Sequence, residues 1–254
     1  MVSSEIRSLK RKRRLITAAF VFVTFFLAFV FLLFCKIKTV NVEGNSFTGE
    51  EEILASAKIT VGAHMYSIKT RDIAERILKE NPYIASVTVK RHLLSTIKIS
   101  VKEDTPVFYF SFGEKFYVIS ENLRVLEEAD SSYGLSARKL SPIILDEIEE
   151  VKIGEKIKFA RKNGYKTYSE IVAALLSSPL ADGITSVDIS SRFNINIMYK
   201  NKYTVVYGSS DGLADKIAFS AKTAKYVEEN LPGITGTIYA TGSGEASFVI
   251  TGTS

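Results

Sequence analysis

Residues 15–35 read LITAAFVFVTFFLAFVFLLFC, and this stretch decides how the rest of the chain is placed. It contains no charged residue, no glycine and no proline, and its only polar side chains are Thr17 and Thr24. As an α-helix with a rise of about 1.5 Å per residue it would be roughly 30 Å long, which matches the hydrocarbon core of a bilayer. Helices in protein cores usually keep a polar stripe. We therefore predict a transmembrane helix over residues 15–35.

Basic residues flank this stretch unequally. Lys36 and Lys38 follow it, whereas six basic residues precede it. These six predicted topology determinants are Arg7, Lys10, Arg11, Lys12, Arg13 and Arg14. Because short basic flanks stay in the cytoplasm, residues 1–14 are predicted to be a cytoplasmic tail and the rest extracytoplasmic. A cleaved signal peptide would have a shorter apolar core and a small-residue exit. The end of the apolar stretch reads Phe34-Cys35-Lys36 and has no such small-residue cleavage site, so we expect an uncleaved signal anchor.

The charge of the chain is concentrated in the tail. The 254 residues carry a net charge of +5, and residues 1–14, with six basic groups and Glu5, account for all of it. The remainder is neutral overall (+5 minus +5), so nucleic-acid binding by the outer part is not expected. Cys35 is the only cysteine. An intramolecular disulfide is thus impossible, and the exported part must be held together by core burial.

Residues 36–105 show the order β-α-α-β-β. A strand pattern in residues 36–44 leads directly from the span, without a flexible linker, so this domain must sit against the bilayer surface. A helix is predicted to open at the capping box formed by Thr48 and Glu51, and a second helix covers about 69–80. Two strands with alternating apolar residues follow before residue 105. Such alternation indicates a sheet with one buried face, which the helices would cover.

Residues 106–254 read mainly as strands. One helix is predicted to open at a second capping box, formed by Thr167 and Glu170, and another covers about 213–229. The last two strands flank Thr241-Gly242-Ser243-Gly244, which is typical of a hairpin turn. The predicted fold class is α+β: a single transmembrane helix, then a β-α-α-β-β domain and a β-rich domain with two helices.

This order of parts resembles the FtsQ/DivIB family of bacterial cell-division proteins. The motifs that carry the resemblance are Val42-Glu43-Gly44-Asn45, Asn81-Pro82-Tyr83-Ile84, IKISVKE at 97–103, and Tyr207-Gly208 followed by Leu213 and Lys216. The chain departs from the family at Asp104, where arginine is common, and near Leu123, where glycine is common. The resemblance implies that residues 36–105 are a POTRA-like domain and residues 106–254 the family's β domain.

The resemblance also implies a function without catalysis. Such proteins are bitopic scaffolds of the divisome at the septum of the cell membrane. They bind FtsL-type and FtsB/DivIC-type division proteins and help regulate septal peptidoglycan synthesis. In the family the end of the β domain accepts a partner strand, which here implies Ser247, Phe248, Val249 and Ile250 as partner-binding residues. A strand at a sheet edge has unpaired N–H and C=O groups that β-addition satisfies. The same alternation fits an ordinary core strand equally well.

Groups that could support catalysis are scarce. His64 and His92 are far apart in sequence, and each is expected to be a solvated turn residue. The acidic run comprises Asp146, Glu147, Glu149 and Glu150, and we interpret it as a solvated face and not as an acid–base or metal site. We therefore predict no catalytic residue, cofactor, metal or small-molecule substrate. The alternative is a membrane-anchored extracytoplasmic cell-wall enzyme.

Overall fold

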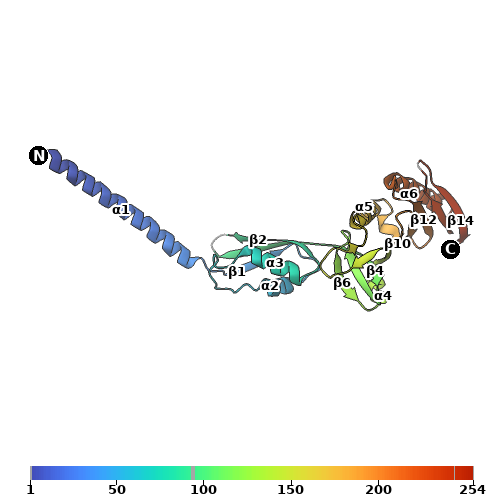
Figure 1. Cartoon of the computed structure of the whole chain (residues 1–254), viewed down its shortest axis with the longest axis horizontal. Helices are drawn as coiled ribbons and strands as arrows, with labels where there is room; N and C mark the ends of the chain where they lie inside the picture. Colours follow the sequence, from blue (N-terminus) through green and yellow to red (C-terminus); the bar gives the residue numbers. More distant parts are fainter. Residues whose placement is uncertain (1, 93–94, 243, 254) are drawn as a thin grey trace. The chain divides into compact units, whose positions relative to one another are not determined.

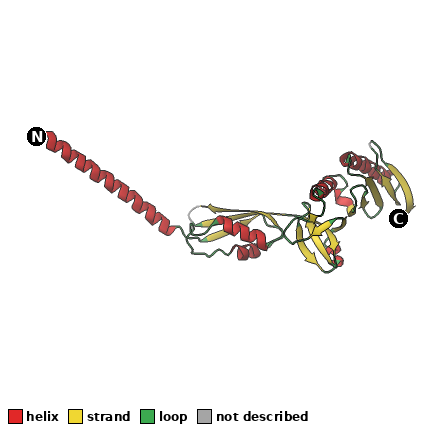
Figure 2. Ribbon diagram, in the orientation of Figure 1, coloured by secondary structure: helices red, strands yellow, loops and turns green. Residues whose placement is uncertain are grey.

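The chain folds into two compact units (Figures 1 and 2). The computed structural model describes residues 2–92, 95–242 and 244–253. The first unit contains the residues up to Glu80 together with Ser86–Lys102. The second contains Asn81–Ala85 and the residues from Glu103 onward.

A single long helix, α1 (Val2–Phe34), opens the chain, so the basic tail continues the same helix as the apolar stretch. Among the described residues, Lys12–Phe31 is the one helical segment long and apolar enough to cross a membrane, and none of it is buried. The hydroxyl groups of Thr17 and Thr24 donate to the carbonyl oxygens four residues earlier, at 2.9 and 2.8 Å. Their polarity is therefore satisfied inside the helix, as hydrocarbon requires.

The side chains of three of the six predicted topology residues, Lys12, Arg13 and Arg14, are exposed. The side chains of Arg7, Lys10 and Arg11 lie outside the described part of the structure. Which side of a membrane they occupy stays a prediction from the flanking charges.

The rest of the first unit has the predicted β-α-α-β-β order. Its elements are β1 (Thr39–Glu43), α2 (Glu50–Ala57), α3 (Thr70–Glu80), β2 (Ile84–His92) and β3 (Thr96–Glu103). The sheet order is β1-β3-β2, and β1 runs parallel to β3 from the pair Thr39↔Thr96 onward. Ile53 of α2 and Ile73 and Ile77 of α3 are buried, as are Ile97 and Ile99 of β3. The two helices therefore contribute apolar side chains to the core, as the alternation predicted.

The second unit is built on a nine-stranded sheet with the order β14-β13-β12-β11-β10-β7-β4-β5-β6. The strands are β4 (Pro106–Phe112), β5 (Lys115–Ser120), β6 (Val125–Ala129), β7 (Ser141–Leu145), β10 (Ile184–Ile189), β11 (Ile195–Tyr199), β12 (Tyr203–Gly208), β13 (Ile234–Tyr239) and β14 (Ser247–Thr253). A separate two-stranded ribbon joins β8 (Ile148–Glu150) to β9 (Lys158–Phe159).

Three α-helices accompany this sheet: α4 (Ser132–Ala137), α5 (Gly164–Leu176) and α6 (Leu213–Asn230), together with a 3-10 turn, η1 (Ala181–Gly183). The two long helices correspond to those predicted, whereas the short α4 was not expected. Its start is capped by Ser131, whose side chain accepts a hydrogen bond from the Tyr133 amide. Helix α6 packs on β12 and β13, and α5 and α6 contact each other.

Both predicted capping boxes are wrong. Helix α2 begins after Gly49, which makes no side-chain cap, and Thr48 is buried before the helix starts. Helix α5 begins at Gly164, so Thr167 already lies inside it and its amide bonds the Asn163 carbonyl at 3.0 Å. A capping sequence offers hydrogen bonds at a helix start, but tertiary packing decides where these two helices begin.

Tyr207 of β12 provides a test of the core of the second unit. Its side chain is fully buried, its hydroxyl lies 3.1 Å from Ser220 Oγ on α6, and burial raises its pKa from 10.0 to about 12. The folded chain therefore keeps this proton between pH 10 and 12, where the unfolded chain releases it. Stability from this group is complete below pH 10 and is lost as the pH rises towards 12, by roughly 3 kcal/mol.

Urea unfolding at pH 8 and at pH 11.5 checks this expectation. The unsubstituted chain should lose more stability between these two conditions than Tyr207→Phe, which has no phenol to ionise. Tyr226 is 62% exposed, so Tyr226→Phe should behave like the unsubstituted chain. Equal losses for all three proteins would contradict the expectation.

Candidate partner-binding edge strand

Strand β14 is the last strand at one end of the nine-stranded sheet (Figure 1). It pairs antiparallel with β13, from Tyr239↔Ser247 to Ile234↔Thr253. The connection is the predicted hairpin, although Ser243 in its turn lies outside the described residues. No strand of the described part of the chain borders the other side of β14. The backbone groups on that side therefore have no ladder partner.

The side chain of Phe248 packs β14 against the core of the second unit. It is half-buried, it packs against the core, and its ring lies edge-on to that of Tyr203 with centroids 6.0 Å apart. On β13, Gly236 lies diagonally across from Phe248, since Ile238 is the direct partner of Phe248, and it leaves the space that the ring needs. A Cβ atom at Gly236 would lie 2.5 Å from the Phe248 ring and 2.4 Å from the Val249 carbonyl oxygen. The ring thus covers a strand glycine, an arrangement that also pins strand register.

The remaining side chains of β14 face solvent. Val249 is 50% exposed and Ile250 is 55% exposed. Because successive side chains of a strand point to opposite faces, these two place apolar surface on both faces of the sheet edge. The sequence of β14, SFVITGT, contains no charged residue and no proline. Charges and prolines are the usual protection of an edge strand against unwanted pairing.

The opposite edge of the same sheet, β6, has such protection. The Val125 amide donates to the Glu155 carbonyl, and the Gly154 amide donates to the Val125 carbonyl, both at 2.8 Å. Farther along β6, Glu127 and Glu128 form ion pairs with Arg138 and Lys115. One edge is therefore covered and charged, whereas the β14 edge is open and apolar.

The structure thus brings the four predicted residues together on one edge strand, with Phe248 half-buried against the core and the others exposed. The prediction missed Gly236, which lets that strand pack. A signal was available, because a glycine inside a strand pattern, here ITGTIY, indicates a close approach of another group.

Comparison with known proteins finds several chains that are similar in sequence. Residues 35–104 match the POTRA domain of the FtsQ type. The cell division protein DivIB of Clostridium acetobutylicum is 29% identical over 189 residues, which are 73% of this chain and 72% of that protein. DivIB of Clostridium botulinum (strain Loch Maree) is 29% identical over 221 residues, covering 85% of this chain and 84% of the relative. The chain is therefore similar to cell division proteins named DivIB over most of its length, and its residues 35–104 are similar to a POTRA domain of the FtsQ type.

A solved structure also matches. It is the major extracytoplasmic domain of DivIB from Geobacillus stearothermophilus, with 14% identity and a TM-score of 0.31, covering 51% of this chain and 98% of that one. A likeness of this size supports no argument about the site. The relatives named above are cell division proteins, and helix α1 of this chain is long and apolar enough to cross a membrane once.

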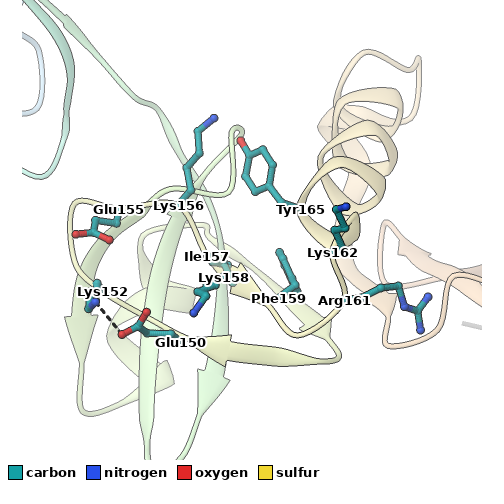
Figure 3. Close-up of a pocket in the computed structure, with 10 residues that line it drawn as sticks. All are labelled: Glu150, Lys152, Glu155, Lys156, Ile157, Lys158, Phe159, Arg161, Lys162 and Tyr165. Atoms are coloured by element: carbon teal, nitrogen blue, oxygen red, sulfur yellow. Dashed lines mark ion pairs between the residues drawn. The ribbon is translucent and has the colours of Figure 1, made fainter.

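A cavity of about 420 Å³ lies between the β8–β9 ribbon and the start of α5, and it is a second region of interest in this chain (Figure 3). Of the acidic run predicted to be a solvated face, Glu150 lines this cavity, and Glu147 and Glu149 pair with cations that line it. Glu150 pairs with Lys152 at 2.7 Å, Glu149 pairs with Lys158 at 3.2 Å, and Glu147 pairs with Arg161. Each of these three carboxylates is therefore opposed by its own cation.

This pairing argues against acid chemistry in the cavity. The hydrogen bond from the Lys152 ammonium lowers the pKa of Glu150, whereas a general acid needs a raised pKa. His64 was expected to be a solvated turn residue, but it is half-buried and forms an isolated β-bridge with Lys36, and its Nδ1 accepts the Tyr66 amide at 3.3 Å. Within the described ranges, no three His, Cys, Asp or Glu side chains form a group that could hold a metal ion.

Proposed function

We propose that this chain is a bitopic division protein with a cytoplasmic N-terminus and both folded units outside the cell membrane, at the division septum. Its partners would be bitopic proteins of the FtsL and FtsB/DivIC types, and through them it would help regulate septal peptidoglycan synthesis. Its role would be binding and not catalysis. The homologues named as division proteins support this proposal, as do α1 and the basic flank before it.

The open edge of β14 is the observation on which the proposal rests. An extended partner segment that pairs with this edge would satisfy its free N–H and C=O groups, and side-chain contacts on the two faces would provide specificity. Val249 and Ile250 would supply those contacts. The contrast with β6 supports this choice of edge, because only the β6 edge has a covering segment and charges among the described residues.

Capture of purified FtsL- and FtsB/DivIC-type proteins by the full chain in bilayer discs tests the proposal. The double variant Val249→Lys/Ile250→Lys should weaken capture at least about tenfold, because lysine on an edge strand opposes pairing. A chain truncated before Ala246 should lose capture entirely. Circular dichroism would check that the double variant remains folded.

The matched control is Ile144→Lys/Ile153→Lys. These isoleucines are 56% and 49% exposed and lie outside the edge strand, so the control adds the same charge at the same exposure. It should retain capture. Equal capture by the edge variant and the unsubstituted chain, or equal loss in edge variant and control, would contradict the assignment of β14.

A further inference from the structure

The residues that follow α1 are hydrogen-bonded directly into the first folded domain. The Cys35 carbonyl accepts the Met65 amide at 2.8 Å. Ile37 donates to the Ala63 carbonyl at 2.9 Å and accepts the Gly62 amide at 2.7 Å. Cys35 and Ile37 are both buried. The segment 60–67, which we call the juxtamembrane loop, is therefore fixed to the first residues after the helix.

This attachment sets the distance of the loop from a bilayer. Cys35 lies at the outer end of the hydrocarbon core if residues 15–35 cross it, and about 6 Å beyond that end along the helix axis if residues 12–31 do. The headgroup layer on each side of a bilayer is roughly 5 to 8 Å thick. Cys35 is therefore in the headgroup layer or at its inner boundary, and the Met65 amide, at hydrogen-bond distance from it, is close to the same depth.

The exposed side chains of the juxtamembrane loop suit that environment. Val61 is 63% exposed and Tyr66 is 55% exposed. The Arg91 guanidinium lies 5.4 Å from the centre of the Tyr66 ring and donates to the Met65 and Ile68 carbonyls at 3.1 and 2.7 Å. Tyrosine is enriched at membrane–water interfaces, where its ring meets acyl chains and its hydroxyl meets water.

The segments next to the juxtamembrane loop are basic, although Arg71 is paired with Glu75 at 2.8 Å. Residues 35–42, 59–71 and 86–92 contain no acidic residue. Their basic residues are Lys36, Lys38, Lys69, Arg71, Lys90 and Arg91. The Lys38 amide donates to the Ser95 carbonyl at 2.7 Å, which places Ser95, the residue before β3, at the same end of the sheet. At the far end of β1, three acidic residues, Glu50 to Glu52, begin α2.

We propose that the juxtamembrane loop is a lipid-binding surface that holds the POTRA-type domain against a bilayer containing anionic phospholipids. Val61 and Tyr66 enter the interfacial layer, and Lys36 and Lys38 contact headgroup phosphates. Cations near an anionic lipid surface favour binding to it. The first domain is therefore held on the membrane by two attachments, the α1 helix and this surface.

Tryptophan fluorescence of the full chain in vesicles tests this proposal, because the chain contains no tryptophan of its own. Val61→Trp and Tyr66→Trp each introduce one reporter at the proposed surface. Phe47→Trp is the matched control, since Phe47 is 54% exposed and follows the far end of β1. Phe25→Trp, within the span, verifies insertion. Quenching by brominated lipids and by aqueous acrylamide is measured in phosphatidylcholine vesicles with and without phosphatidylglycerol.

Tryptophan at 61 or 66 should lose roughly half of its emission to bromine placed high on the acyl chain, because interfacial aromatic rings sit at that depth. Tryptophan at 47 should respond only to acrylamide. Lys36→Gln/Lys38→Gln should lower the lipid quenching at 61 in anionic vesicles. The proposal is overturned if 61 and 66 behave like 47 while tryptophan at 25 is quenched by lipid. Unchanged lipid quenching in the Lys36→Gln/Lys38→Gln variant would overturn the proposal that these two lysines contact headgroup phosphates.

Discussion

Replacing Gly236 with valine is expected to detach β14 from the sheet and to lower the free energy of unfolding by about 3 kcal/mol, at the upper end of overpacking costs. The added Cβ would lie 2.4 Å from the Val249 carbonyl oxygen and within 2.6 Å of two Phe248 ring atoms. Because one of these neighbours is backbone, a side-chain rotation cannot relieve the overlap. The strand itself must move, and the Phe248 ring must leave its place beside Tyr203.

Gly242→Val provides the comparison. Gly242 lies in the same hairpin, does not require a positive φ, and has no neighbouring atom within 4 Å of the point where a Cβ would lie. Its substitution should change stability by less than about 0.5 kcal/mol. Urea unfolding gives the stability, and capture of partner proteins should fall only for Gly236→Val. Similar stability of the two variants would show that β14 is not anchored as described.

Arg124→Ala is expected to destabilise the second unit by about 3 to 5 kcal/mol, as loss of one partner of a buried ion pair generally does. Arg124 donates to the Ile84 carbonyl at 2.7 Å and to the Gly154 carbonyl at 2.8 Å, and its guanidinium lies 3.6 Å from the Asp104 carboxylate. The Arg124 and Asp104 side chains are only 15% and 6% exposed. Alanine would leave a buried carboxylate without its cation and two carbonyl groups without their donor.

Two further variants make this expectation specific. Arg124→Lys keeps the charge but not the planar fork of donors, so it should recover only part of the loss. Lys200→Ala removes an exposed partner of Glu228 at 2.7 Å and should cost no more than about 1 kcal/mol. Urea unfolding followed by circular dichroism measures all three. A loss for Arg124→Ala no larger than that for Lys200→Ala would contradict the role assigned to Arg124.

Much of the fold could be predicted because its signals are local. The uninterrupted apolar run gives α1, and the alternation in residues 97–101 gives β3 with Ile97 and Ile99 buried. Helix boundaries were less predictable, as the starts of α2 and α5 show, because packing of Thr48 and Gly164 outweighs local capping. Leu123 adopts a φ of 53° near the position where the family has glycine. Its complete burial offsets a conformational cost of about 1 kcal/mol.

The candidate site could be predicted only in part. The position of β14 at an edge is consistent with its place as the last strand pattern, but the sequence could not show which of the two sheet edges is protected. Protection of β6 depends on the contact of Val125 with Gly154 and Glu155, about thirty residues later in the chain. The pairing of Asp104 with Arg124 is equally non-local. Such contacts follow from the folded topology and have no local sequence pattern.

The burial of Cys35 has a consequence for the redox chemistry of the protein. Its thiol is 1% exposed and donates to the Phe31 carbonyl at 3.3 Å. Oxidation and disulfide exchange require an accessible thiolate, so the only sulfhydryl of the chain is shielded from oxidants and thiol reagents. Two copies of the native chain therefore have no accessible thiol through which to become covalently cross-linked, and their associations must be reversible.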